Sequence, residues 1–134
     1  MFRVAVLLAS LLYAPAAAFA ADFPVCDSAK RVTCVVDGDT VWFRGTKYRF
    51  EDIDTPEKGG LAECPQEALQ AAEATERLAE ILSEHAFIII PSGRQDRYGR
   101  DLARFMIGER SAGEMLVEQG LARPWRWHTE DWCE

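Results

Sequence analysis

The sequence has few residues of the kinds that bind transition metals. It contains two histidines, and none of its four cysteines lies at CxxC spacing from another. Zinc sites normally require such closely spaced ligands, so a zinc-binding module is disfavoured. An even number of cysteines instead predicts two disulfides in an oxidising compartment and leaves all three pairings open. The cysteines are Cys26, Cys34, Cys64 and Cys133.

Positive charge is also scarce. Lys and Arg total 15 against 22 Asp and Glu, which gives a formal net charge of −7. This balance excludes a protein that coats nucleic acid through bulk positive charge. The charge is uneven, because residues 51–84 hold ten acidic and two basic residues, whereas residues 94–126 hold seven arginines and five acidic residues. A phosphate-containing partner is therefore expected to bind at the arginine-rich stretch and not across the whole surface.

No apolar run is long enough to span a membrane. A short run at residues 4–12 follows Arg3, and Ala18-Phe19-Ala20 then forms the small-x-small pattern of a signal-peptidase site. We therefore predict that residues 1–20 are a signal peptide and that the protein is exported to the periplasm or the medium. After cleavage we expect no membrane association. The remaining residues suffice for one hydrophobic core and are too few for two.

Runs of β-branched residues between turn signals predict five strands, at residues 31–36, 40–44, 47–53, 86–90 and 101–107. Arg44-Gly45-Thr46 is expected to close a hairpin, and Pro91-Ser92-Gly93 to end the fourth strand.

Two helices are predicted. Pro65 and the apolar stripe that follows it predict a helix over residues 65–84, with Glu67, Glu73 and its other glutamates on a solvated face. Ser111 and Glu114 have capping-box spacing before a short second helix that ends near Gly120.

This order predicts a mainly β, α+β fold. We expect a five-stranded Greek-key barrel with a long helix after the third strand and a short helix after the fifth. A single domain would span residues 31–126, followed by a tail at 127–134 that contains tryptophan and cysteine. The alternation of the third strand slips near Asp52, which indicates either a β-bulge or an ordinary strand end with Asp52 in solvent.

Three segments are unusually polar for their predicted positions: residues 37–40, 49–57 and 96–100. Taken singly, acidic turns are mostly solvent-facing caps. Together the segments supply aspartate oxygens for a hard cation, a glutamate that can accept a proton from water, and two arginines that can hold a phosphate. These groups suffice for metal-assisted hydrolysis of a phosphodiester.

These segments, with Leu116-Val117-Glu118-Gln119-Gly120-Leu121-Ala122, match in order the motifs of the thermonucleases, the staphylococcal nuclease-like family. The chain resembles that family from about residue 34 to 125. The resemblance implies an OB-fold barrel and a calcium-dependent nuclease that acts on DNA and RNA.

The resemblance also implies a role for each matching residue. Metal binding is expected from the carboxylates of Asp39 and Asp54 and the backbone carbonyl of Thr55. Transition-state stabilisation is expected from Arg49 and Arg100, and general-base catalysis from Glu57. Contacts to the phosphate of the nucleotide are expected from Arg97 and Tyr98.

Other interpretations remain open at this stage. The domain is alternatively a non-catalytic OB-fold module that binds single-stranded nucleic acid or a protein partner, or a structural domain stabilised by a cation. Trp125 and Trp127 either pack or stack on bases, and packing is favoured. We expect the long C-terminal helix of the best-known relatives to be missing here, and a disulfide from Cys133 and tryptophan packing to replace it. We expect a monomer.

Overall fold

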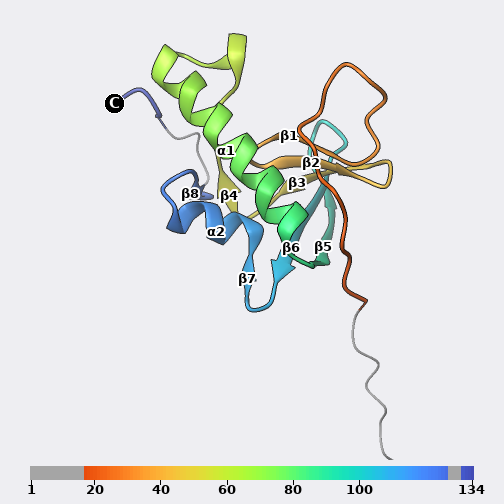
Figure 1. Cartoon of the computed structure of the whole chain (residues 1–134). Coiled ribbons are helices and arrows are strands. Elements are labelled where there is room, and N and C mark those ends of the chain that lie inside the picture. The colour runs from red at the N-terminus through yellow and green to blue at the C-terminus, as the bar shows by residue number, and fades with distance from the viewer. Residues whose placement is uncertain (1–16, 127–130) are drawn as a thin grey trace, which may run out of the picture.

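The computed structural model describes residues 17–126 and 131–134 of the chain (Figure 1). Apart from residues 17–20, the predicted signal peptide lies outside these residues, as does Trp127. The strands are β1 (Cys34–Asp37), β2 (Thr40–Phe43), β3 (Thr46–Phe50), β4 (Ile53–Asp54), β5 (Ile88–Gln95), β6 (Asp101–Ile107), β7 (Arg110–Ser111) and β8 (Arg123–Pro124). The helices are α1 (Pro65–Glu84) and α2 (Ala112–Glu118), with a 3₁₀ turn at Gly59–Leu61.

The main sheet follows the order β1-β2-β3-β6-β5, and β7 pairs with the end of β6. Only the β3–β6 pair is parallel among these pairings. The predicted hairpin is present between β2 and β3, where Arg44 and Gly45 both have positive φ. The mixed α+β class is confirmed, but within the described residues the pairings leave an open path, with none between β1 and β5 that would close a barrel.

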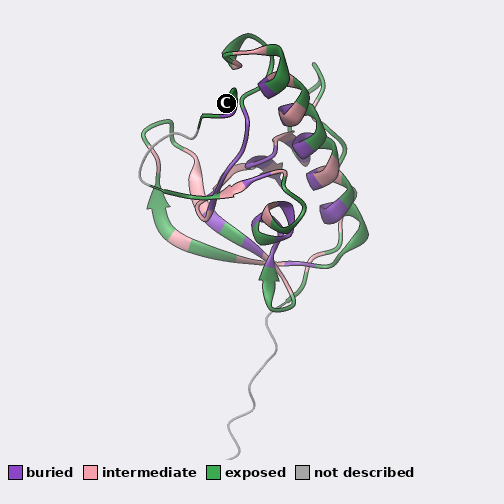
Figure 2. Ribbon diagram, turned by 90° about the vertical axis from the view of Figure 1, so that its left-hand side faces the viewer, coloured by how far each residue is buried: buried purple, intermediate pink, exposed green. Residues whose placement is uncertain are grey.

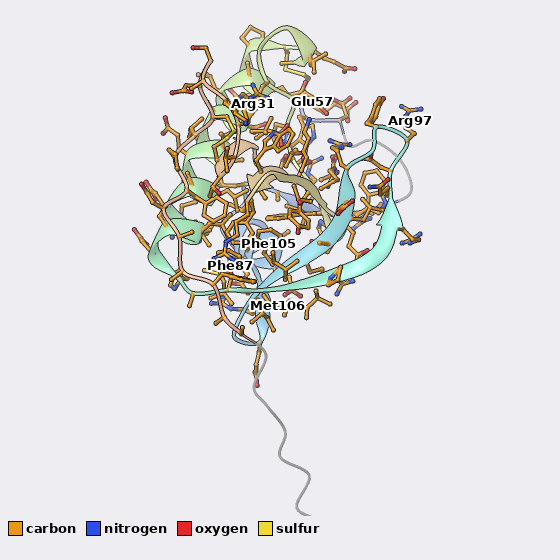
Figure 3. The ribbon with its side chains drawn as sticks, turned by 90° about the vertical axis from the view of Figure 1, so that its right-hand side faces the viewer. Arg31, Glu57, Phe87, Arg97, Phe105 and Met106 are labelled. Carbon is orange, nitrogen blue, oxygen red and sulfur yellow. A yellow bond between two sulfur atoms is a disulfide. The ribbon has the colours of Figure 1, made fainter. Side chains whose placement is uncertain are left out.

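The core lies between the sheet and the two helices. Phenylalanine rings dominate it, and the ring centroids of Phe87 and Phe105 are 5.1 Å apart (Figure 3). Figure 2 shows the buried residues of α1 along the face that is turned toward the sheet. Aromatic side chains bury large apolar areas, so this cluster supplies much of the packing energy of a small domain.

Segments outside the predicted domain also contact this core. Phe23 is buried, and Phe19 exchanges two backbone hydrogen bonds with Phe87 at 2.7 and 2.9 Å. At the other end Trp132 is buried, with the guanidinium of Arg123 4.2 Å from its ring centroid. The tryptophan packing that we expected for the tail is thus present at Trp132.

The fourth predicted strand does not end at Pro91. β5 continues through Pro91 to Gln95, with a register shift between these two residues. β5 is the last strand in the path of the sheet, and a proline, which lacks an N–H donor, is tolerated on such an edge strand.

The irregularity near Asp52 is neither a bulge nor a solvent-exposed strand end. β3 stops at Phe50, and the chain then leaves the main sheet and forms β4, which pairs antiparallel with β8. The hydroxyl of Ser111 donates to the Asp52 carboxylate at 2.6 Å, and the backbone N–H of Trp125 donates to the Asp52 carbonyl at 2.8 Å. Asp52 therefore connects this strand switch to the start of α2 and to the residue that follows β8.

Both helices have the predicted ends. α1 begins at Pro65 and ends at Glu84. At α2 the capping box is complete, because the N–H of Glu114 donates to Ser111 at 2.9 Å and the N–H of Ser111 donates to Glu114 at 2.7 Å. In residues 17–126 and 131–134 we find no helix with the length and apolar character needed to cross a membrane.

All four cysteines form disulfides. Cys26 is bonded to Cys34, and Cys64 to Cys133, across sequence separations of 8 and 69 residues. The second bond fixes the chain end beside the start of α1, as expected for Cys133. Both bonds indicate an oxidising environment.

Candidate active site

Close packing around Gly38 brings two acidic segments together. Gly38 lies in the β1–β2 turn between Asp37 and Asp39, directly against Thr55 and α1. A methyl group added at Gly38 would lie 2.8 Å from Cγ2 of Thr55 and 2.9 Å from Cβ of Ala74. Only glycine permits this approach, which places the turn beside Thr55 at the end of β4.

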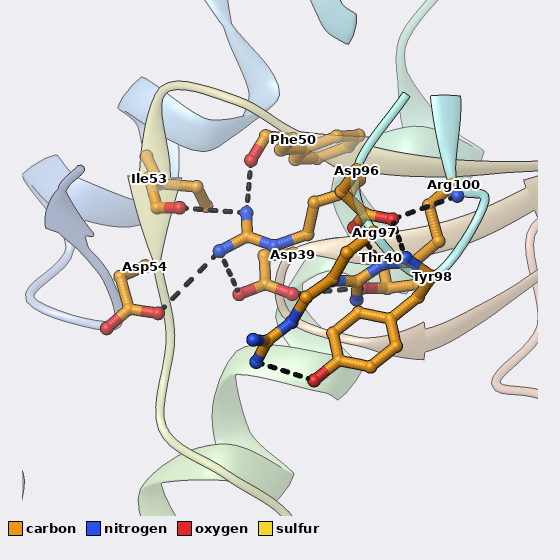
Figure 4. Close-up of polar contacts among 10 residues, drawn as sticks. Asp39, Thr40, Phe50, Ile53, Asp54, Asp96, Arg97, Tyr98 and Arg100 are labelled. Carbon is orange, nitrogen blue, oxygen red and sulfur yellow. Dashed lines mark hydrogen bonds and ion pairs between the residues drawn. The ribbon is translucent and has the colours of Figure 1, made fainter. Parts of the chain in front are cut away.

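The Arg49 side chain links the two segments by contacting Asp39 and Asp54, which are labelled in Figure 4. Its Nη2 lies 3.2 Å from the carboxylate of Asp39 and 3.7 Å from that of Asp54. Its Nη1 donates to the carbonyls of Phe50 and Ile53, the latter at 2.9 Å. The guanidinium is largely buried and has four directed contacts, so its position is fixed by the strand switch after β3.

Arg100 reaches the same region from the turn between β5 and β6. Its Nε lies 2.5 Å from the carboxylate of Asp96, and its Nη1 donates to the hydroxyl of Thr40 at 3.3 Å. That hydroxyl donates in turn to the carboxylate of Asp39 at 3.0 Å. Thr40 therefore connects Arg100 to one of the expected metal ligands.

Asp96 organises the whole turn. It accepts the backbone N–H groups of Tyr98 and Arg100 at 2.9 and 3.0 Å, as well as the Arg100 side chain. Burial acts to raise the pKa of Asp96, but the hydrogen bonds from Arg100 and Tyr98 prevail and lower it. The carboxylate is therefore ionised at neutral pH and can hold the arginine.

Arg97 and Tyr98 lie at the exposed tip of this turn. The guanidinium of Arg97 donates to the Tyr98 hydroxyl at 2.8 Å and lies 4.9 Å from the centroid of its ring. Tyr98 is 69% exposed. Both groups are accessible to a ligand in the adjacent pocket.

Glu57 is exposed and follows β4 on the loop before α1. Partial desolvation, and then the negative charges of Asp39, Asp54 and Glu67, raise its pKa, while Arg49 opposes the shift. These interactions place Glu57 within the electrostatic reach of both aspartates.

Asp37 and Asp39 bring two carboxyl groups together in the β1–β2 turn. Burial, followed by the charge of Asp39 and hydrogen bonding to it, raises the pKa of Asp37 to about 8. Such crowding of carboxylates is relieved by a cation.

The oxygen donors of the site are of the kinds that bind calcium. The carboxylates of Asp39 and Asp54 lie on either side of the same guanidinium, because Arg49 contacts both. Thr55, which follows Asp54 in the chain, is buried. Carboxylate and carbonyl oxygens are the ligands that calcium prefers, and water or substrate oxygens usually complete its shell of about six to eight. No cluster of three or more His, Cys, Asp or Glu side chains suited to a metal occurs in the described part of the chain. Asp39, Asp54 and Thr55 offer oxygen donors of the kind that calcium prefers, and water or substrate would have to supply the remaining ligands.

A pocket of about 360 Å³ lies beside these groups. It contains four of the predicted functional residues and one tryptophan that we expected to pack rather than to face a ligand. Its lining comprises Arg49, Phe50, Glu51, Asp96, Arg97, Tyr98, Arg100, Leu102 and Trp125. Trp125 is 44% exposed, and the Arg49 guanidinium lies 5.6 Å from its ring centroid. A ligand entering the pocket would therefore meet arginines and the exposed rings of Tyr98 and Trp125.

The staphylococcal nuclease homologue family model matches residues 47–132, more than half of the chain. The chain belongs to this family. The match confirms the resemblance inferred from the motifs and supports nuclease-type activity on nucleic acid in general. Comparison with curated proteins gave no match.

Sequence reasoning missed several residues of the site. The capping role of Asp96 was detectable, because an aspartate four residues before Arg100 in a Gly-containing turn is a common way to hold such a turn. The bridging hydroxyl of Thr40 and the close approach at Gly38 depend on contacts between distant segments and gave no local signal. Trp125 reaches the pocket only because β8 pairs with β4.

Proposed function

We propose that the protein is an exported, calcium-dependent nuclease that hydrolyses phosphodiester bonds of DNA and RNA. The observation that carries the proposal is the bridge made by Arg49, whose guanidinium contacts Asp39 at 3.2 Å and Asp54 at 3.7 Å. A third expected functional residue, Arg100, is joined to Asp39 through a single hydroxyl. Groups from the three polar segments of the sequence thus lie beside one pocket.

Asp39, Asp54 and the Thr55 carbonyl would hold calcium, which when bound neutralises charge on a phosphate and orients its oxygens. The contacts of Asp39 with Thr40 and Arg49 fix its carboxylate before any cation binds. Such preorganisation lowers the cost of assembling the site around substrate.

Glu57 would act as the general base. It follows Pro56, whose restricted φ limits the directions that the next residue can take. A carboxylate on an exposed loop beside the two aspartates can accept a proton from a water molecule that attacks phosphorus.

Arg49 and Arg100 would bind the phosphate oxygens as negative charge increases in the transition state. Arg49 is held by carboxylates and carbonyls, and Arg100 by a carboxylate and a hydroxyl, so little rearrangement is needed during the reaction. We expect them to affect kcat more than KM, because their interactions strengthen as the charge develops.

The protein would bind the nucleic acid only near the pocket, through the arginines there that are not neutralised by surface ion pairs. Arg104 and Arg110 are paired with Glu51 and Glu118 on the surface, whereas Arg97 contacts the uncharged side chain of Tyr98 through its hydroxyl and its ring. With a net charge of −7, we expect modest affinity and weak sliding along DNA.

The test is cleavage of DNA and of RNA by the mature protein with calcium, with excess chelator, and by a Glu57→Gln variant. We expect cleavage that the chelator abolishes and that Glu57→Gln lowers by about 100-fold or more. The matched control is Glu109→Gln, an exposed glutamate in the β6–β7 turn, which should cleave like the wild type.

A non-catalytic binding module is the second candidate, favoured by the exposed rings of Tyr98 and Trp125 beside the pocket. Exposed aromatic rings of this kind can stack on bases without catalysis. Binding of single-stranded nucleic acid with no calcium-dependent cleavage would support this alternative and contradict the nuclease.

A further inference from the structure

Glu67 is buried, although its sequence position predicted a solvated face. Only 4% of the surface of Glu67 is exposed, whereas Glu73 and Glu76 on the same helix are exposed. Buried carboxylates are rare unless every oxygen has a partner. The partners of Glu67 therefore indicate what it does.

Both carboxylate oxygens accept backbone N–H groups from the loop that carries the proposed general base. Oε1 accepts the N–H of Glu57 at 3.0 Å, and Oε2 accepts the N–H of Glu63 at 2.7 Å. Glu67 thus fastens both ends of the segment 57–63 to the first turn of α1. The Lys58 ammonium attaches the same segment to β1 by donating to the carbonyl of Val36 at 2.6 Å, whereas the two bonds to Glu67 hold the backbone itself.

This double attachment requires a carboxylate. Hydrogen bonds from neutral donors to a charged acceptor are stronger than neutral ones. A glutamine of the same size has one acceptor oxygen and one NH₂ group, so it would accept one backbone N–H and oppose the other with a donor.

The second disulfide covers this arrangement. Cys64 precedes α1 and its sulfur accepts the N–H of Glu67 at 3.4 Å, while the sulfur of Cys133 lies 3.9 Å from Oε2 of Glu67. The bond holds the chain end over the carboxylate. Partial exclusion of water strengthens the two backbone hydrogen bonds.

We propose that Glu67 is a positioning residue that holds the backbone of Glu57 where its carboxylate can act as the base. The inference rests on the proposed nuclease function, in which Glu57 is the base. Glu67 itself would not touch substrate, and its effect would pass through the amide of Glu57.

The kinetic test compares wild type, Glu67→Gln and the control Glu73→Gln, assayed with calcium and a short DNA substrate at a temperature where all three are folded. We expect kcat of Glu67→Gln to fall by about 10- to 100-fold, with KM and calcium affinity within about threefold of wild type. Glu73→Gln should match the wild type. An unchanged kcat would overturn the proposal. So would a fall in kcat accompanied by an equal rise in KM and an equal loss of calcium affinity.

Amide hydrogen exchange, measured by NMR, separates positioning from general destabilisation. In Glu67→Gln the amides of Glu57 and Glu63 should exchange faster, while those of β6 keep their protection. Uniformly faster exchange, or no change at Glu57, would contradict a local attachment. If the wild type fails to cleave, the proposed function is wrong, and the exchange comparison still decides whether Glu67 fastens the segment 57–63.

Discussion

Arg100 depends on Asp96 for its direction, because it lies on a turn with no other acidic contact among those described. Asp96 binds two backbone amides and the guanidinium of Arg100 at once, and its side chain is only 17% exposed. One carboxylate therefore sets both the shape of the turn and the aim of a proposed catalytic group.

We expect Asp96→Asn to lower kcat by about tenfold and the free energy of unfolding by about 1–2 kcal/mol at pH 7. The pKa of Asp96 is lowered in the folded state. The ionised Asp96 therefore contributes its full stabilisation above pH 3.8, the pKa of the group in the unfolded chain. This stabilisation is lost as the pH falls through the lower pKa of the folded state. Urea unfolding of both proteins from pH 7 to pH 2.5 should show their difference shrinking only below about pH 4. A constant difference, or one that grows on acidification, would be inconsistent with this role.

At the scale of elements, the site depends on how closely the β1–β2 turn approaches α1 and the end of β4. Gly38 has no space for a side chain, whereas Gly60, in the loop before α1, has no neighbouring atom within 4 Å of an added methyl group. The two positions allow the same substitution to be compared in a tight and an open environment.

Gly38→Ala should destabilise the protein by about 1–3 kcal/mol and weaken calcium binding, because the turn must move away from Thr55 and Ala74. Gly60→Ala should change the free energy of unfolding by less than about 0.5 kcal/mol. Urea unfolding and calcium titration measure both effects. Equal stability of the two variants would show that close packing at Gly38 is unimportant.

The elements that were predicted well are those with complete local signals. The helix at 65–84 has a proline at its start and an apolar period of 3.6, and the strand at 101–107 follows a glycine turn; both have the predicted bounds. The predicted end of the fourth strand at Pro91 was wrong, because a strand at the edge of a sheet can tolerate proline. Which strand lies at the edge depends on the pairing of the whole sheet.

The site could be predicted only in part, for a similar reason. The motifs named Asp39, Asp54 and Arg49, but their meeting depends on the strand switch after Phe50, which the sequence presented only as a slip in alternation. Glu67 lies among exposed glutamates in sequence, and nothing local distinguishes it. Its burial follows from the loop that folds back over it.

At the scale of the whole molecule, two disulfides restrain very different lengths of chain. Cys26–Cys34 spans 8 residues within the N-terminal region, and Cys64–Cys133 spans 69 and ties the chain end to α1. The loss of chain entropy in the unfolded state grows with the length of the closed loop.

Removal of the long-range bond by Cys64→Ala with Cys133→Ala should cost about 4 kcal/mol, against about 2.5 kcal/mol for Cys26→Ala with Cys34→Ala. The two double variants serve as each other's control in thermal and urea unfolding. The reverse order of stability would mean that the tail contributes little to holding the fold together.

The most direct test of the account is a calorimetric titration of the mature protein with calcium, together with Asp39→Asn, Asp54→Asn and the control Asp22→Asn, which alters an exposed aspartate outside the site. We predict one bound calcium ion per chain in the wild type and in Asp22→Asn, and loss of that binding in each of the other two variants. Absence of binding in the wild type, or full binding after removal of either carboxylate, would contradict a shared cation site between Asp39 and Asp54.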